Sequence, residues 1–306
     1  MATHPIPVTS GLLARGRHVA GSAVLSDYWT VTKPDVNFLI AFTTAASFSI
    51  GAPQSLSGFP WMALLHAVVG TVTAASGAAT LNQWIERGFD ARMRRTARRP
   101  IAAGRMQSSH ALRFGTILSL VGVVYLAFNS GLLASLLTGV TLLSYLLIYT
   151  PLKRITPLCT AVGAVPGALP PLIGWAAARG RLDWEALVLF AIVFLWQFPH
   201  FMAIAWMYRD DYDRAGYAVL PHGRARVPFV VWQTISPLVA LVMASLLPVV
   251  MGNAGLLYGI GALCLDGAFL CYGAQFAFQR TASSARRLLL ASILYLPPLL
   301  LLLTFG

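Results

Sequence analysis

Long apolar stretches follow one another along nearly the whole chain, and they restrict its fold more than any other feature. Only 10% of the residues are charged and 57% are hydrophobic, whereas soluble domains carry about 25% charged residues. Inside a bilayer the backbone must satisfy its own hydrogen bonds, and a helix needs about 20 apolar residues to cross. The sequence therefore predicts an all-α, polytopic membrane protein.

Charged residues and Pro/Gly clusters divide the apolar sequence into nine predicted transmembrane helices. These spans lie near 36–52, 61–83, 112–130, 132–150, 158–178, 186–207, 228–250, 254–278 and 287–305. The first is short and contains several polar residues. We expect a single transmembrane domain over residues 28–306, preceded by a tail of residues 1–27.

The distribution of basic residues orients these spans, because lysine and arginine concentrate on the cytoplasmic side. With nine spans and a cytoplasmic N-terminus, every lysine and arginine except Arg179 and Arg181 falls on that side. This topology explains the net charge of +12 and removes the need for a nucleic-acid partner. It also places two long loops, near 84–111 and 208–227, on the cytoplasmic face of the membrane, which we expect to be the inner membrane of the cell.

Two carboxylates and an amide recur every four residues at the end of the second span. A helix turns once in about 3.6 residues, so Asn82, Glu86 and Asp90 share one face. Oxygen ligands in this arrangement suit Mg²⁺, and the arginines that follow suit a phosphate. The alternative is a helix end with local ion pairs to Arg87 or Arg94. Mutual repulsion between the two carboxylates favours the metal.

A second acidic cluster follows the cytoplasmic end of the sixth span and consists of the pair Asp210 and Asp211 together with Asp213. If spans two and six face each other, both acidic segments would surround one set of ions bridging a diphosphate. By itself the pair is more typical of a solvated turn. Within the sixth span, Gln197 and His200 suggest a polar-aromatic pocket, although ordinary packing explains them equally well.

Tyr145, Tyr149, Lys153 and Arg154 close the fourth span on the same predicted face. The two basic side chains suit phosphate, but tyrosine and lysine also anchor spans at the membrane interface. Asp266 lies within the eighth span, where a carboxylate is a functional candidate by default.

These segments together resemble the UbiA superfamily of intramembrane prenyltransferases. Asn82, Glu86 and Asp90 match its motif Asn-x-x-x-Asp-x-x-x-Asp. The likeness is closer to the members that farnesylate haem, the haem O synthases. It rests on Tyr149-Thr-Pro-Leu-Lys153-Arg154, on Trp196-Gln-Phe-Pro-His200 and on Tyr208-Arg-Asp-Asp211-Tyr212. The resemblance covers the chain from about residue 28 to its end.

The resemblance implies transfer of a farnesyl group from farnesyl diphosphate to a vinyl group of haem B, with addition of water. It implies Mg²⁺ bound by Asn82, Glu86, Asp90 and Asp211, with Asp210 also in the catalytic set. A haem A synthase or an oxidase assembly protein is the implied protein partner. The implied substrate-binding residues are Arg92, Arg95, Arg99, Lys153, Arg154, Gln197, His200, Tyr145, Tyr149 and Tyr208.

Two positions depart from the family pattern. Glu86 stands where an aspartate is usual, and Asp35 stands where the haem-farnesylating members commonly have arginine. Three other functions remain open: a UbiA-type enzyme with an aromatic or quinone-precursor acceptor, a transporter or channel, and a non-catalytic haem assembly factor. A transporter or channel would not explain why both acidic segments lie on one predicted face of the membrane.

Overall fold

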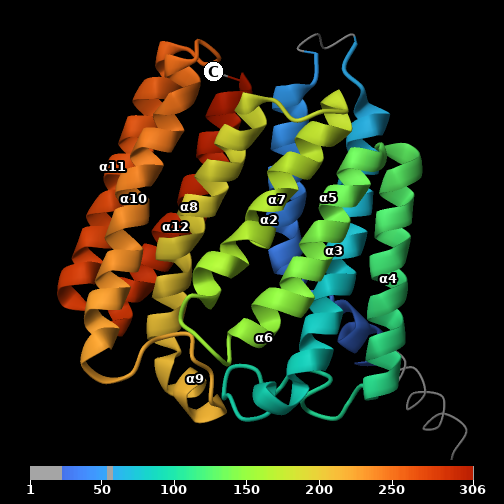
Figure 1. Ribbon diagram of the computed structural model, residues 1–306, viewed down its shortest axis with the longest axis vertical. Coiled ribbons are helices and arrows are strands. Elements are labelled where there is room, and N and C mark those ends of the chain that lie inside the picture. The colour runs from blue at the N-terminus through green and yellow to red at the C-terminus, as the bar shows by residue number, and fades with distance from the viewer. Residues whose placement is uncertain (1–22, 54–57, 306) are drawn as a thin grey trace, which may run out of the picture.

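The computed structural model describes residues 23–53 and 58–305, which are helical with no strand among them. Residues 23–31 form the first described helix. The remaining elements are α2 (Pro34–Gly51), α3 (Trp61–Asp90), α4 (Ser108–Asn129), α5 (Leu132–Leu143), a π-helical segment (Ser144–Tyr149), α6 (Thr150–Leu152), α7 (Cys159–Arg179), α8 (Trp184–Met207), α9 (Arg209–Ala215), a 3₁₀ turn (Gly223–Ala225), α10 (Arg226–Val250), α11 (Leu256–Gln279) and α12 (Ala282–Phe305). The long helices run side by side in one bundle (Figure 1).

Within the described residues, eight helices are long and apolar enough to cross a membrane. The expected all-helical, polytopic fold is therefore confirmed, but the count of nine spans is one too high. The exception is the first predicted span. Most of this span lies in α2 (Pro34–Gly51), but the 18 residues of that helix include Asp35 and several small polar side chains.

Helix α2 can carry polar side chains because these side chains face neighbouring helices. It lies between α3 and α7 (Figure 1). Asn37 donates a hydrogen bond to Ser76 of α3 at 2.8 Å, and the Ser47 hydroxyl donates to the Pro171 carbonyl of α7 at 2.6 Å. Such interhelical hydrogen bonds replace the apolar contacts that a lipid-facing helix makes.

One end of the bundle carries most of the irregular structure. Residues 91–107, α6 and α9 lie together there, and the C-terminus lies at the opposite end (Figure 1). Helix α3 continues past the predicted span to Asp90, so the loop predicted over 84–111 begins later. The boundary predicted between residues 27 and 28 falls inside the helix of residues 23–31. Residues 1–22 of the predicted tail lie outside the described residues.

Asp266 lies buried between the three C-terminal helices. Its carboxylate accepts a hydrogen bond from Ser245 of α10 at 2.6 Å and another from Tyr295 of α12 at 2.7 Å. Tyr258 donates to the Ser245 carbonyl at 2.7 Å. A carboxylate within a bundle must have such partners, and here they join α10, α11 and α12.

Candidate active site

The last turns of α3 carry a buried polar stripe. Asn82, Glu86 and Asp90 are 2%, 4% and 1% exposed, and the four-residue spacing keeps them on one side of the helix. Buried carboxylates are costly unless they are paired or hydrogen-bonded. The elements around α3 supply those partners.

Each side chain of the stripe meets a cation from a different part of the chain. Lys33 Nζ lies 3.4 Å from Asn82 Oδ1, Lys153 forms an ion pair with Glu86, and Arg99 lies 2.8 Å from Asp90 Oδ2. The local pairing considered from the sequence does not form, since Arg87 donates to the Trp84 carbonyl at 2.7 Å instead. The stripe is thus neutralised by tertiary contacts.

Lys33 has an unusual backbone. Its φ of 53° and ψ of 64° lie in the left-handed region, which a residue with a side chain seldom adopts. This conformation precedes the proline that begins α2. Burial and the nearby Arg99 lower the pKa of the Lys33 ammonium to about 7. The site residues predicted from the sequence did not include Lys33.

Tyr217 and Thr150 are two further partners that sequence reasoning missed. The Tyr217 hydroxyl donates to Glu86 Oε1 at 2.9 Å, and Asn82 Nδ2 donates to Thr150 Oγ1 at 3.1 Å. Burial and the adjacent Glu86 carboxylate raise the pKa of Tyr217. No spacing pattern connects Tyr217 with α3, because the contact arises from the path of the segment after α9.

The second acidic pair divides between solvent and the protein interior. The Asp210 side chain is 80% exposed and lies 3.7 Å from Arg209. Asp211 is buried, and its carboxylate accepts the backbone N–H of Arg95 at 3.1 Å and the Arg214 guanidinium at 3.0 Å. Burial opposes ionisation of Asp211. The backbone N–H groups of Arg94 and Arg95 and the Arg214 guanidinium nevertheless keep the pKa of Asp211 below its usual value.

The common ion site of both acidic segments stays a prediction. Across residues 23–53 and 58–305, no group of three or more His, Cys, Asp or Glu side chains is placed to hold a metal ion. Asp211 contacts the loop after α3, while the Asp210 side chain is exposed.

Basic and aromatic side chains alternate around the stripe. Lys153 Nζ lies 4.9 Å from the Tyr149 ring centre, and the Arg154 guanidinium lies 4.0 Å from that of Phe89. Tyr145 and Tyr149 have ring centres 5.5 Å apart. These contacts hold both predicted phosphate-binding cations near α3 through their attraction to ring faces.

The arginines after α3 adopt separate positions. Arg92 lies over Phe89 at 5.8 Å, and Arg95 lies over Tyr208 at 4.8 Å. Arg99 alone of these three reaches the acidic stripe through a contact described above. The loop therefore contributes one direct partner of the stripe and two cations that lie over aromatic rings.

Gln197 and His200 engage neighbouring helices instead of the stripe. Gln197 donates to the Ala164 carbonyl of α7 at 2.9 Å. His200 Nδ1 is hydrogen-bonded to Ser292 Oγ of α12 at 2.8 Å, and its ring stacks on Trp196 with centres 4.9 Å apart. Gln197 therefore contacts α7 and His200 contacts α12, whereas the sequence suggested one pocket for both side chains.

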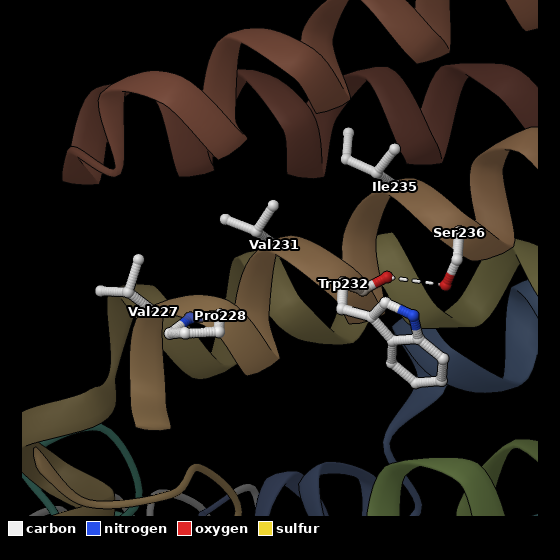
Figure 2. A pocket seen from close by; sticks show the side chains of 6 residues that line it. All are labelled: Val227, Pro228, Val231, Trp232, Ile235 and Ser236. Carbon is white, nitrogen blue, oxygen red and sulfur yellow. Dashed lines mark hydrogen bonds between the residues drawn. The ribbon is translucent and has the colours of Figure 1, made fainter. Parts of the chain in front are cut away.

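An apolar groove on α10 lies outside this site. Figure 2 shows the side chains that line it along one helix, where the Ser236 hydroxyl donates to the Trp232 carbonyl at 2.8 Å. The lining residues are Val227, Pro228, Val231, Trp232, Ile235 and Ser236. A single apolar helix face of this kind is what lipid contacts in a membrane bundle.

Fold and site together define a polytopic, all-helical membrane protein with a buried cluster of acidic and basic groups at one end. The chain belongs to the UbiA prenyltransferase family, whose model matches residues 39–296. The family resemblance read from the motifs is thereby confirmed.

Relatives and solved structures agree with this assignment. The chain is 46% identical over 279 residues to a protoheme IX farnesyltransferase of Solibacter usitatus, covering 89% of this chain and 96% of the relative. It is 40% identical over 289 residues to one of Koribacter versatilis, covering 90% and 91%. A UbiA homolog from Aeropyrum pernix K1 has a TM-score of 0.68 at 18% identity, with 86% and 95% covered. A UbiA homolog from Archaeoglobus fulgidus, bound to GPP and Mg²⁺, has a TM-score of 0.61 at 12% sequence identity. The match covers 90% of this chain and 99% of that structure.

Proposed function

We propose that this protein transfers the farnesyl group of farnesyl diphosphate to a vinyl group of haem B, which yields haem O. The curated relatives named protoheme IX farnesyltransferase support the donor and the acceptor. The structural observation that carries the proposal is the convergence of Lys33, Lys153 and Arg99 on the buried stripe. Three basic side chains around two carboxylates and an amide form a site suited to a polyanion.

The proposed reaction begins with cleavage of the C–O bond between the farnesyl chain and its diphosphate. The cations around the stripe stabilise the charge that accumulates on the departing diphosphate. The π electrons of the haem vinyl group form the new C–C bond to the allylic cation. Water adds to the resulting carbocation and releases a proton, which leaves a hydroxyethylfarnesyl group and free diphosphate.

We further propose that Mg²⁺ binds the diphosphate at this stripe. The donor set fits, because two carboxylates and an amide oxygen on one helix face are ligands that a hard cation prefers. Asn82, Glu86 and Asp90 would hold the ion, which would supply additional positive charge to the leaving group. The Archaeoglobus fulgidus homolog bound to GPP and Mg²⁺ supports this at the level of the family. A ligand role for Asp211 remains a prediction that competes with the role argued below.

The remaining substrate contacts are also proposals. Arg92, Arg95 and Arg154 border the stripe and suit the diphosphate or the haem propionates. His200 lies half-buried against Trp196 and suits contact with a macrocycle. The other residues in this proposed set are Gln197, Tyr145, Tyr149, Tyr208 and Asp210.

We propose an inner-membrane location with the site facing the cytoplasm. The support is the bias of basic residues, together with the two charged loops at one end of the bundle (Figure 1). The product would pass to a haem A synthase or an oxidase assembly protein. Cysteine labelling of Ser108 and Gly180 positions from each side of the membrane would test the orientation.

The function is tested by incubating the purified protein in detergent with haem B, farnesyl diphosphate and Mg²⁺. We expect a product whose mass equals haem B plus a farnesyl group and a hydroxyl group, and no product after chelation by EDTA. Product from an aromatic acid acceptor, with none from haem B, would support the alternative UbiA-type activity. No product from either acceptor would contradict the proposed function.

Tyr217→Phe is expected to lower the rate of farnesyl transfer about tenfold to a hundredfold. The change removes the hydroxyl that donates to Glu86 Oε1, and a hydrogen bond to a charged group contributes about 1.5–3 kcal/mol. Steady-state kinetics with farnesyl diphosphate measure the effect. The phenyl ring retains the packing against Phe89.

Glu86→Asp provides the matched comparison, because it shortens the side chain by one methylene and withdraws the carboxylate from Tyr217. We expect a loss at least as large, because the shorter side chain also withdraws from Lys153. The combined variant should lose less than the sum of the two, since both changes remove the contact between Glu86 and Tyr217. Fully additive losses would show that Glu86 and Tyr217 act independently.

A further inference from the structure

Asp211 joins two segments that are far apart in the sequence. Its Oδ2 accepts the backbone N–H of Arg95, and its Oδ1 accepts the side chain of Arg214 in the same short helix. We propose that Asp211 is a positioning residue, which fixes the loop of residues 91–107 against α9 and thereby places Arg99 at the acidic stripe. This inference rests on the proposed function for its kinetic consequences.

Arg95, which Asp211 holds, and Arg99, which contacts the stripe, are only four residues apart in the loop. Thr96 directly follows Arg95, and its hydroxyl donates to the Asp90 carbonyl at 2.9 Å. Three residues later, Arg99 contacts both carboxylate oxygens of Asp90, at 2.9 and 2.8 Å. The loop therefore folds back on the end of α3, with Asp211 holding its far side.

Two other contacts between the loop and the α9 segment support the same interpretation. The Arg95 guanidinium donates to the Tyr212 hydroxyl at 3.3 Å and lies over the Tyr208 ring. Met93 of the loop packs into a buried cluster with Ala215 and Tyr217. Charge, hydrogen bonding and apolar contact thus act at one interface.

Both oxygens of Asp211 accept N–H donors, one of them from a guanidinium. A role in holding the loop uses these contacts as they are. A carboxylate has about four lone-pair sites, so the choice between holding the loop and binding a metal ion is made by experiment.

Asp211→Asn separates the two roles. Asparagine offers one acceptor and one donor, so either the Arg95 N–H or the Arg214 guanidinium would face another donor. Asp213→Asn is the matched control on α9. Asp213 pairs with Arg226 at 3.0 Å and has no described contact with residues 91–107.

The first measurement is hydrogen exchange of the ligand-free protein in detergent. We expect the amides of residues 91–107 to exchange about tenfold faster in Asp211→Asn than in the unchanged protein or in Asp213→Asn, because a charge-assisted hydrogen bond is lost. Unchanged exchange in that loop would overturn the proposal. This measurement requires no activity, so it stands even if no haem product is found.

The second measurement is the kinetic dependence on each ligand. Positioning predicts a KM for farnesyl diphosphate raised about tenfold in Asp211→Asn, with an unchanged Mg²⁺ concentration at half-maximal rate. A rise in that Mg²⁺ concentration would overturn the proposal in favour of a metal ligand. Lower total activity with an unchanged KM would overturn it in favour of a general loss of folded protein.

Discussion

Asp90→Ala is expected to lower the rate of farnesyl transfer about a thousandfold, which is the scale seen when a group that stabilises developing charge is removed. The substitution removes a proposed Mg²⁺ ligand, and it also leaves Arg99 without the carboxylate that both of its contacts reach. Single-turnover assays with haem B and farnesyl diphosphate at saturating Mg²⁺ measure the change.

Two comparison variants identify the cause of that loss. Asp90→Asn keeps an oxygen but removes the charge, and we expect most of the loss to persist because Mg²⁺ prefers carboxylate. Glu185→Ala, at the beginning of α8, is expected to retain full activity. Full activity of Asp90→Ala in a folded protein would contradict the proposed site.

Gly174→Ala is expected to destabilise the protein by about 3 kcal/mol, the upper part of the range for added bulk in a packed interior. A Cβ at position 174 would collide with the Thr44 carbonyl oxygen and lie 3.1 Å from the Phe48 backbone nitrogen. Backbone atoms of α2 cannot rotate away as a side chain can. Thermal unfolding in detergent should therefore show a lower Tm.

Gly139→Ala in α5 is the control for this substitution. An added Cβ there meets nothing within 4 Å, and alanine is the better helix former. We expect an unchanged or slightly higher Tm. Equal Tm values for the two variants would show that α2 and α7 do not approach as closely as the structure indicates.

The helical spans could be predicted from the sequence because a segment that crosses a bilayer must satisfy its own backbone hydrogen bonds. Seven predicted spans agree with their helices to within a few residues, and the second extends to Asp90. Helix α2 marks the limit of this reasoning. Its residues Asn37 and Ser47 find hydrogen-bond partners in α3 and α7, and local hydropathy carries no information about a neighbouring helix.

The stripe of Asn82, Glu86 and Asp90 was likewise readable from its period, because one helix alone determines which side chains share a face. Its partners were not. Lys33, Lys153 and Tyr217 come from three distant segments, and no local pattern relates a loop residue to the helix that it contacts. Glu86 illustrates the difference, since the longer acid departs from the motif in sequence but meets Lys153 and Tyr217 in space.

The sequence by itself determined the membrane class, the family and the acidic stripe, because hydropathy, helical period and motif spacing are properties of short segments. Tertiary structure alone decided which cation meets each member of the stripe and that Asp211 holds the loop after α3. The physical reason is that buried charge must be compensated wherever the fold places it, and that placement depends on the packing of the whole bundle.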